Sequence, residues 1–240
     1  EYKMLELSCE RAQLQNGQRI LELGCGWGSL TLFMARKYPQ SPITALSHSA
    51  TQRSHIEAVC QREGLDNVTV ITADINAFQC TDTFDRIVSI EMFEHLSNYK
   101  TLFRLLRSWL APNGKVFVHV FGHPSFCYPF TNSSSTDWMA RHFFTGGIMP
   151  AKDTFSQFCS PLQIEQQWDV NGTHYQKTCN AWLANLHSHK KTILDIFAES
   201  QLPSPTRSFV AWRIFFMACA ELFGYQNGNQ WQVFHFRFSH

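Results

Sequence analysis

Two carboxylates and an imidazole lie within five residues of one another, at Glu91, Glu94 and His95. They follow an apolar, strand-like run at residues 84–90. In a tight turn or at the start of a helix, these three side chains lie close together on one side. A partly buried carboxylate beside a histidine is a common way to build a base that works near neutral pH. We therefore predict that the three residues are catalytic. The alternative is a helix start whose acidic residues complement the helix dipole.

A glycine-rich loop follows an earlier apolar run. Residues 20–30 read ILELGCGWGSL, with Gly24, Gly26 and Gly28 spaced two apart. Glycine has no Cβ, so the backbone can turn sharply here and lie against a ligand. A helical segment starts at Ser29, and its free N–H groups would point at that ligand. A nicotinamide or flavin site needs a sixth-position glycine and an acid about 20 residues further on, and both are absent. A purely structural turn is the other alternative.

These residues need a scaffold that brings strand ends together. The pattern predicts strands at residues 19–23, 43–46, 68–72, 84–90 and 115–121, and helices at 29–37, 50–63 and 99–110. Such alternation is typical of an α/β fold with a mostly parallel sheet and helices on both faces. Ligands bind at the carboxyl ends of the strands in these sheets. The strand exits that include Ser47, Asp74 and His119 should therefore form the site, and residues 1–122 its core.

The second half of the chain has a different character. Residues 123–160 contain many aromatic residues, Gly, Pro and Ser, with a low-complexity patch at 133–135, and we interpret them as an inserted lid with a hinge at Gly146-Gly147. Residues 161–240 should complete the core sheet and supply pocket helices. Their predicted elements are a strand at 162–170, a helix at 175–198, a turn at 202–205, a buried helix at 209–223 and a strand at 231–238. The total is seven strands, with the last two antiparallel.

Composition narrows the function classes. A net charge of +1 over 240 residues does not suggest nucleic acid or an anionic membrane as the main partner. The eight cysteines form no C-x-x-C pair, which argues against a zinc ribbon. We expect no metal, because His119 and His123 have no third ligand at a suitable spacing. No secretory leader follows Glu1, and the longest apolar run is shorter than the roughly 20 residues of a membrane span. We therefore expect a cytoplasmic protein without a membrane span.

Several segments resemble a known enzyme family. Residues 21–30, 49–52 and 84–95 are similar to the cyclopropane fatty acid synthase superfamily. Residues 141–150, 170–175, 212–216 and 220–225 are similar to its branch of plant coclaurine N-methyltransferases. The resemblance implies the Rossmann-like, seven-stranded fold of S-adenosylmethionine-dependent methyltransferases. It also implies N-methylation of a small cyclic or aromatic, alkaloid-like amine, while a homodimer stays open.

The resemblance assigns roles to individual residues. In it, Glu94 with His95 takes the proton of the amine and Glu91 holds the ammonium, while Asp74 contacts the adenine amino group. Aromatic faces attract the sulfonium and the developing ammonium. The cofactor-binding residues implied are Glu22, Gly24, Gly26, Gly28, Ser47, Gln52, Asp74, Ile75 and Ile90. The substrate-pocket residues implied are Phe93, His119, Tyr128, Trp138, Phe143, Phe144, Trp212, Phe215 and Phe216.

Other functions stay open at this stage. Glu94 and His119 match bicarbonate ligands of the lipid-modifying synthases, but Ile214 and Phe215 stand where a tyrosine ligand is expected. That departure favours the amine over an acyl lipid. The family carries a Tyr-Ser-Cys segment ahead of Glu1, so we expect a truncated or processed form. A non-catalytic S-adenosylmethionine-binding protein and an O-methyltransferase are the remaining alternatives.

Overall fold

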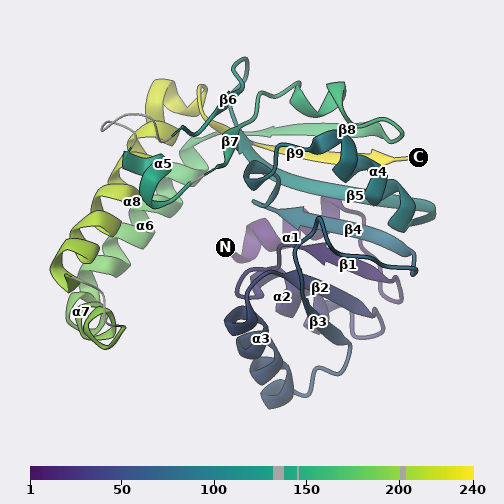
Figure 1. Ribbon diagram of the computed structural model, residues 1–240, viewed down its shortest axis with the longest axis horizontal. Helices are drawn as coiled ribbons and strands as arrows, with labels where there is room; N and C mark the ends of the chain where they lie inside the picture. Colours follow the sequence, from purple (N-terminus) through teal and green to yellow (C-terminus); the bar gives the residue numbers. More distant parts are fainter. Residues whose placement is uncertain (132–137, 145, 201–203) are drawn as a thin grey trace.

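Helices and strands alternate through the first half of the chain (Figure 1). The structure is a computed structural model that describes residues 1–131, 138–144, 146–200 and 204–240. The elements of this half are α1 (Tyr2–Arg11), β1 (Ile20–Leu23), α2 (Ser29–Lys37), β2 (Ile43–Ser47), α3 (Ala50–Glu63), β3 (Val68–Thr72), β4 (Phe84–Ile90), the 3-10 helix η1 (Phe93–His95), α4 (Tyr99–Trp109) and β5 (Leu110–Gly122).

Among the described residues, the second half adds a small two-stranded sheet, four α-helices, a 3-10 helix and two further strands of the main sheet. Residues 123–160, for which the sequence predicts only a lid, contain an antiparallel pair of short strands and a short helix. The predicted patch at 133–135 and part of the turn at 202–205 lie outside the described residues. The elements are β6 (Tyr128–Pro129), α5 (Trp138–His142), β7 (Ile148–Met149), the 3-10 helix η2 (Thr154–Gln157), β8 (Gln163–Val170), α6 (Thr173–Ser188), α7 (Lys190–Glu199), α8 (Pro205–Gly228) and β9 (Gln232–Ser239).

The main sheet has seven strands in the order β3-β2-β1-β4-β5-β9-β8. The five strands of the first half are parallel, whereas β9 is antiparallel to β5 and to β8. This confirms the predicted mostly parallel sheet with an antiparallel last pair. Leu23 pairs with Leu46 and with Ser89, and Ile90 pairs with His119. The register therefore brings the exits of β1, β2, β4 and β5 together at one edge.

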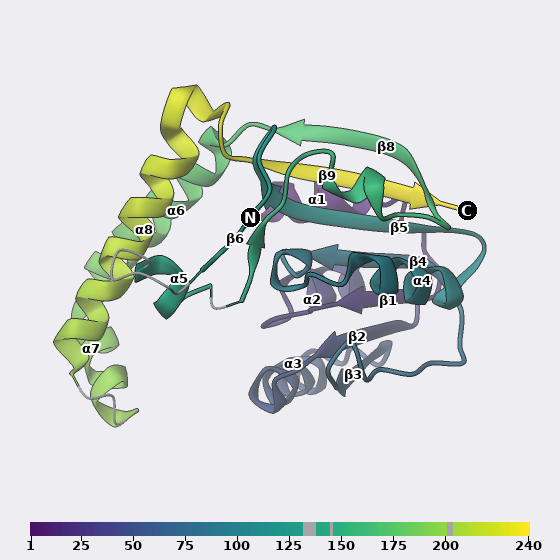
Figure 2. The same cartoon turned by 45° about the horizontal axis from the view of Figure 1, so that its top comes forward.

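Helices cover both faces of the sheet (Figure 2). On one face, α1, α2 and α3 pack through apolar side chains such as Phe33, Met34 and Ile56. On the other, α4 and η2 pack through Phe103, Leu106 and Phe155. Because helices lie on both sides, every residue of β1 is buried, as is usual for a parallel strand. The core thus holds the strand exits rigidly.

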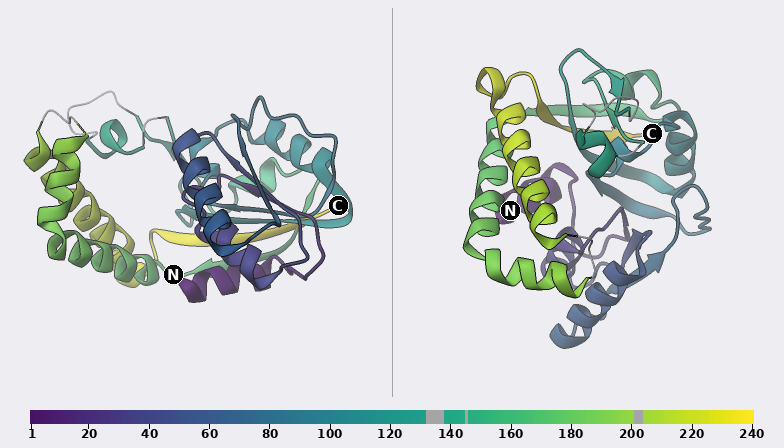
Figure 3. Two further views of the ribbon diagram at one scale, coloured as in Figure 1. Left: turned by 90° about the horizontal axis from the view of Figure 1, so that it is seen from below. Right: turned by 60° about the vertical axis from the view of Figure 1, so that its left-hand side comes forward.

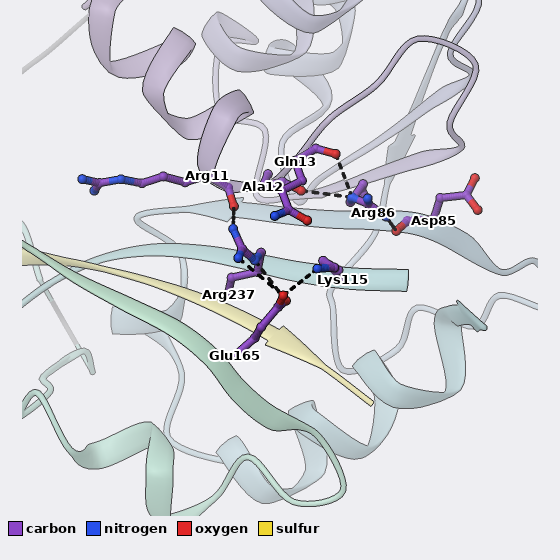
Figure 4. A network of polar contacts seen from close by, with 8 residues as sticks. All are labelled: Arg11, Ala12, Gln13, Asp85, Arg86, Lys115, Glu165 and Arg237. Carbon is purple, nitrogen blue, oxygen red and sulfur yellow. Dashed lines mark hydrogen bonds and ion pairs between the residues drawn. The ribbon is translucent and has the colours of Figure 1, made fainter. Parts of the chain in front are cut away.

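The end of α1 is attached to the sheet by arginines (Figure 4). Arg86 Nε donates to the carbonyls of Ala12 and Gln13 at 3.0 and 3.1 Å, and Arg237 Nη1 donates to the carbonyl of Arg11 at 2.8 Å. The last carbonyls of a helix have no partner within the helix. The guanidinium groups satisfy them and fix the position of α1.

Helices α6, α7 and α8 form a helical arm beside the sheet (Figures 1 and 3). The sequence predicts one helix at residues 175–198, but the structure has two. His189 leaves the helical region with φ −106° and ψ 20°, and its ring and backbone N–H both contact the carbonyl of Asn185. These contacts end α6 and let α7 start in a new direction.

The helix predicted at residues 209–223 is confirmed within α8, but the prediction that it is buried is wrong. Val210, Ile214 and Met217 of α8 are each more than 40% exposed. The arm stands away from the sheet, so neighbouring helices cover only one side of α8. In the part of the chain that the structure describes, α8 alone is long and apolar enough to cross a membrane, and 22% of its most apolar window is buried. Length and composition by themselves are weak evidence for a span.

Candidate active site

The exit of β4 lies directly against the glycine loop. Glu91 has φ +50°, an uncommon conformation for a residue with a side chain. Its backbone N–H donates to the carbonyl of His119 at 2.9 Å. Gly24 has φ +77°, and a Cβ there would lie 2.8 Å from Met92. The chain can therefore bring these two segments together only with glycine at this position.

A cavity of about 420 Å³ opens between these segments. This volume is within the range of small-molecule sites, roughly 300–1,000 Å³. The cavity contains six of the nine predicted cofactor residues, together with Glu91 and His95. The lining residues are Gly24, Gly26, Leu46, Ser47, His48, Gln52, Ala73, Asp74, Ile75, Asn76, Glu91, Met92, His95 and Leu96.

The residues of this cofactor cavity fit S-adenosylmethionine. A Cβ on Gly26 would meet nothing within 4 Å, so the backbone is open to a ligand there. Ser47 Oγ donates to Gln52 Oε1 at 2.6 Å, which orients two polar groups at the exit of β2. The exposed carboxylate of Asp74 can accept from an exocyclic amino group, and its Oδ1 is held by Asn76 N–H at 2.7 Å. Polar groups are thus spaced along an otherwise apolar cleft.

Three predicted cofactor residues do not line this cavity. Glu22 is buried and accepts from Thr31 Oγ1 at 2.5 Å, and burial raises the pKa of its carboxyl to about 7. Gly28 lies against α3, where a Cβ would be 2.7 Å from Ile56. Ile90 packs on the apolar cluster beneath α1 and α2. These three residues therefore lie at the base of the glycine loop and not in the cavity.

Two groups hold the carboxylate of Glu91. Tyr175 Oη donates to Oε2 at 2.8 Å, and His119 Nε2 lies 3.5 Å from Oε1. Tyr175 comes from α6, which is 84 positions away in the sequence. Burial, followed by the effect of Glu91, raises the pKa of Tyr175 well above its ordinary value, so the hydroxyl stays protonated as a donor. Glu91 is therefore oriented from two sides.

Glu94 lies underneath the site instead of facing it. Its side chain is fully buried, and Oε1 accepts from the backbone N–H of Phe121 at 2.8 Å. The other oxygen, Oε2, has no hydrogen-bond partner among the described residues. Burial, and then the nearby Glu91, raises the pKa of Glu94 well above its ordinary value. Burial thus disfavours the charged form of this carboxyl.

His95 is accessible from the cofactor cavity and touches the lid. Its ring stacks on Phe144 with centroids 6.2 Å apart and 13° between the planes. Desolvation by these neighbours lowers the pKa of His95, against the opposing effect of Glu91. A neutral imidazole can accept a proton, so His95 has the right state for a base.

A second cavity, of about 230 Å³, is aromatic and lies between the lid and the helical arm. Tyr175 and Phe144 belong to its wall, and they contact Glu91 and His95 respectively. The two cavities therefore adjoin at the predicted catalytic residues. The lining residues are Phe121, Tyr128, Phe130, Met139, Phe144, Met149, Tyr175, Cys179, Trp182, Phe215, Cys219, Leu222 and Phe223.

Three of the nine predicted substrate residues, Tyr128, Phe144 and Phe215, line this aromatic cavity. Phe93 does not: it is fully buried against Tyr99 and Phe155 in the core. His119 is buried behind Glu91. The others pack around the cavity wall: Phe143 stacks on Phe215 at 4.1 Å, Trp138 and Trp212 contact Phe143, and Phe216 contacts Trp182 and Trp212.

Sequence reasoning missed several residues of both cavities. Tyr175 ends the segment 170–175 that carries part of the family resemblance, so a signal for it existed. For Trp182, Cys179 and Cys219, helical spacing alone cannot say which face of α6 or α8 meets the lid. Within the residues that the structure describes, no group of three or more His, Cys, Asp or Glu side chains could hold a metal ion.

Comparison with known proteins identifies the family. The family model described as mycolic acid cyclopropane synthetase matches residues 1–233. The (S)-coclaurine N-methyltransferase of Thalictrum flavum subsp. glaucum is 36% identical over an alignment of 243 positions, which covers 99% of this chain and 67% of that protein. The cyclopropane-fatty-acyl-phospholipid synthase of Escherichia coli (strain K12) is 32% identical over 231 residues, 95% of this chain and 56% of that protein.

Solved structures show the same architecture. A coclaurine N-methyltransferase bound to N-methylheliamine and SAH superposes with a TM-score of 0.94 at 35% identity, over 100% of this chain and 70% of that one. A mycolic acid cyclopropane synthase complexed with SAH, at 23% identity and a TM-score of 0.80, shares the fold. The chain therefore belongs to the mycolic acid cyclopropane synthetase family and is an S-adenosylmethionine-dependent methyltransferase with a Rossmann-like fold.

Proposed function

We propose that this protein N-methylates a small, cyclic, alkaloid-like secondary amine. The observation that carries the proposal is the place where the two cavities adjoin: the Glu91 carboxyl group and the His95 imidazole lie between a cofactor cavity and a compact aromatic one. A flat amine fits an aromatic box, whereas an acyl chain needs a long channel. The alkaloid N-methyltransferases among the relatives support the same substrate class.

S-adenosylmethionine supplies the methyl group. The task of the protein is to align the amine with it, exclude water and remove one proton. A secondary aliphatic amine is mostly protonated at pH 7 and attacks only when neutral. Glu91 attracts the ammonium, and aromatic faces in the cavity wall favour the same cation. His95, held neutral by desolvation, then accepts the proton.

This assignment gives the base to His95 and not to Glu94. Glu94 is fully buried, does not line the cofactor cavity and has one oxygen engaged by Phe121 N–H, so it is not placed to take a proton from the substrate. Glu94 instead holds the end of β5 against η1. Glu91 is then the carboxylate that faces the amine.

The test is transfer of labelled methyl from S-adenosylmethionine to 1,2,3,4-tetrahydroisoquinoline, with unsaturated phospholipid as the competing acceptor. For His95→Ala we expect kcat to fall by about 10²–10⁴-fold. His187→Ala, on the exposed side of α6, is the matched control and should leave kcat unchanged. Label that enters only the phospholipid, or a His95→Ala variant with full activity, would refute the proposal.

A further inference from the structure

A row of side chains connects α1 to Glu91 through the interior of the sheet. Arg11 Nη1 lies 2.8 Å from His235 Nδ1, and His235 Nε2 lies 2.9 Å from His119 Nδ1. His119 Nε2 in turn lies 3.5 Å from Glu91 Oε1. His235 is fully buried and His119 is 6% exposed. The two histidines face each other because they are paired across β5 and β9.

The direction of every proton in this row follows from its first member. Arginine has five N–H donors and no acceptor. His235 must therefore accept at Nδ1 and carry its proton on Nε2, which donates to His119 Nδ1. That leaves the His119 proton on Nε2, directed at Glu91. Each imidazole has a defined tautomer and is neutral, because one of its nitrogens is an acceptor.

Arg11, the first member of the row, is held by contacts of its guanidinium and of its backbone carbonyl. Its guanidinium lies over the ring of Trp168, 4.9 Å from the centroid, and Arg237 lies over the same ring at 5.3 Å. Arg237 also donates to the Arg11 carbonyl, as Figure 4 shows. Burial is the largest cause that lowers the pKa of His235 to about 2, and the neighbouring His119 and Arg11 contribute to the lowering. His235 thus stays neutral chiefly because it is buried, and Arg11 fixes which of its nitrogens accepts.

Glu91 gains two properties from this row. One oxygen faces the His119 N–H and the other accepts from Tyr175, so the carboxylate has a single orientation. The N–H belongs to a neutral ring, so no imidazolium cancels the charge that attracts an ammonium. The 3.5 Å separation is long for a hydrogen bond, and such contacts commonly tighten when substrate binds.

We propose that Arg11 and His235 are positioning residues for amine binding, which act by fixing the tautomer of His119 and through it the orientation and charge of Glu91. This inference rests on the proposed function for the identity of the ligand. The docking of α1 then becomes a determinant of the substrate site, although Arg11 lies 80 positions before Glu91 and 224 before His235.

Kinetics on the full chain with 1,2,3,4-tetrahydroisoquinoline test the proposal. Arg11→Met and His235→Phe should each raise KM for the amine about fivefold to tenfold, because either change weakens the contact of the His119 N–H with the Glu91 carboxylate. The kcat should change less than about twofold. Arg11→Lys keeps a donor and should recover most of the loss. Because both act through one row, the double variant should be no worse than either single variant.

Arg86→Met is the matched control, because Arg86 also donates to the end of α1 but makes no hydrogen bond to His119 or His235 among the described residues. Its KM should equal that of the wild type. An equal rise in Arg86→Met, or additive effects of Arg11→Met and His235→Phe, would overturn the proposal, since loosening of α1 or independent packing would then explain the data.

Nitrogen-15 NMR of the histidine rings gives a readout without any amine. Both His119 and His235 should carry their proton on Nε2 in the wild type, and Arg11→Met should convert His119 to a tautomer mixture. A proton on Nδ1 of His119 in the wild type, or an unchanged His119 in Arg11→Met, would overturn the proposal. If no amine is methylated, the proposed function fails, and this comparison still decides whether Arg11 sets the tautomer.

Discussion

Replacing Glu22 by glutamine should stabilise the protein, and only above acidic pH. Glu22 is 3% exposed, and its carboxyl has a pKa of about 7 against an ordinary value of 4.5. The folded state keeps this proton up to about pH 7, whereas the unfolded chain releases it near pH 4.5. The unfolded state binds fewer protons in this window, so stability falls as the pH rises through it and stays low above it.

The magnitude follows from the same two pKa values. Each pH unit of separation is worth about 1.36 kcal/mol, so the buried carboxyl costs about 3 kcal/mol of stability at pH 8. Glutamine is neutral at every pH and keeps an acceptor for the Thr31 hydroxyl, which now lies 2.5 Å from Glu22 Oε2. Any cost of the new amide N–H groups is independent of pH.

Urea unfolding at pH 5 and pH 8 measures this effect. The advantage of Glu22→Gln over the wild type should be larger at pH 8 than at pH 5 by at least about 2 kcal/mol. The exposed Glu221 provides a control, since Glu221→Gln should show the same difference from wild type at both pH values. If the advantage of Glu22→Gln over the wild type differs by less than about 0.5 kcal/mol between pH 5 and pH 8, the argument that burial raises the pKa of this carboxyl is refuted.

Three further predictions concern the loop and the two cavities. In a urea titration, Gly28→Ala should lower the free energy of unfolding by about 2–4 kcal/mol, because φ is +87° and the new Cβ would lie 2.7 Å from Ile56. Gly17→Ala is the control: φ is +92° but the space around it is open, so it should cost only about 1 kcal/mol. Asp74→Asn should weaken S-adenosylmethionine binding about tenfold by calorimetry without changing the melting temperature, since the residue is exposed and lines the cofactor cavity; unchanged affinity would contradict this role. Phe215→Ala should raise KM for the amine about tenfold and Phe216→Ala less than threefold, because only Phe215 lines the aromatic cavity, and equal effects would argue against that cavity as the amine site.

The local sequence determined the framework of the site. Apolar runs and helical spacing predicted most strands and helices of the first half to within one or two residues, because their apolar side chains pack between two helical layers. The exceptions are α1, which was not among the predicted elements, and β5, which begins at Leu110 instead of residue 115. The glycines at 24 and 26 and the acidic segment at 91–95 were recognisable for the same reason: backbone conformation and strand exits depend on neighbours in sequence. These features indicated an α/β methyltransferase and its cofactor cavity before any contact was known.

Only the tertiary structure decided which side chains line the aromatic cavity proposed for the amine. Helical periodicity does not say that one face of α8 stays uncovered, nor that Phe215 lines a cavity while Phe216 packs behind it. The burial that raises the pKa of Glu94 comes from packing of η1 beneath β5, and no sequence pattern reports that. Contacts such as Tyr175 with Glu91 join residues far apart in the chain.

The same distinction explains the row from Arg11 to Glu91. Its members are unremarkable in sequence, an arginine at a helix end and two histidines within strands. The pairing of β5 with β9 aligns the two imidazoles, and the docking of α1 adds the donor that sets their protons. Residue type and local spacing thus determined which chemistry was available, whereas long-range packing decided which groups are charged, neutral or oriented, because burial and hydrogen-bond partners are set by neighbours in space.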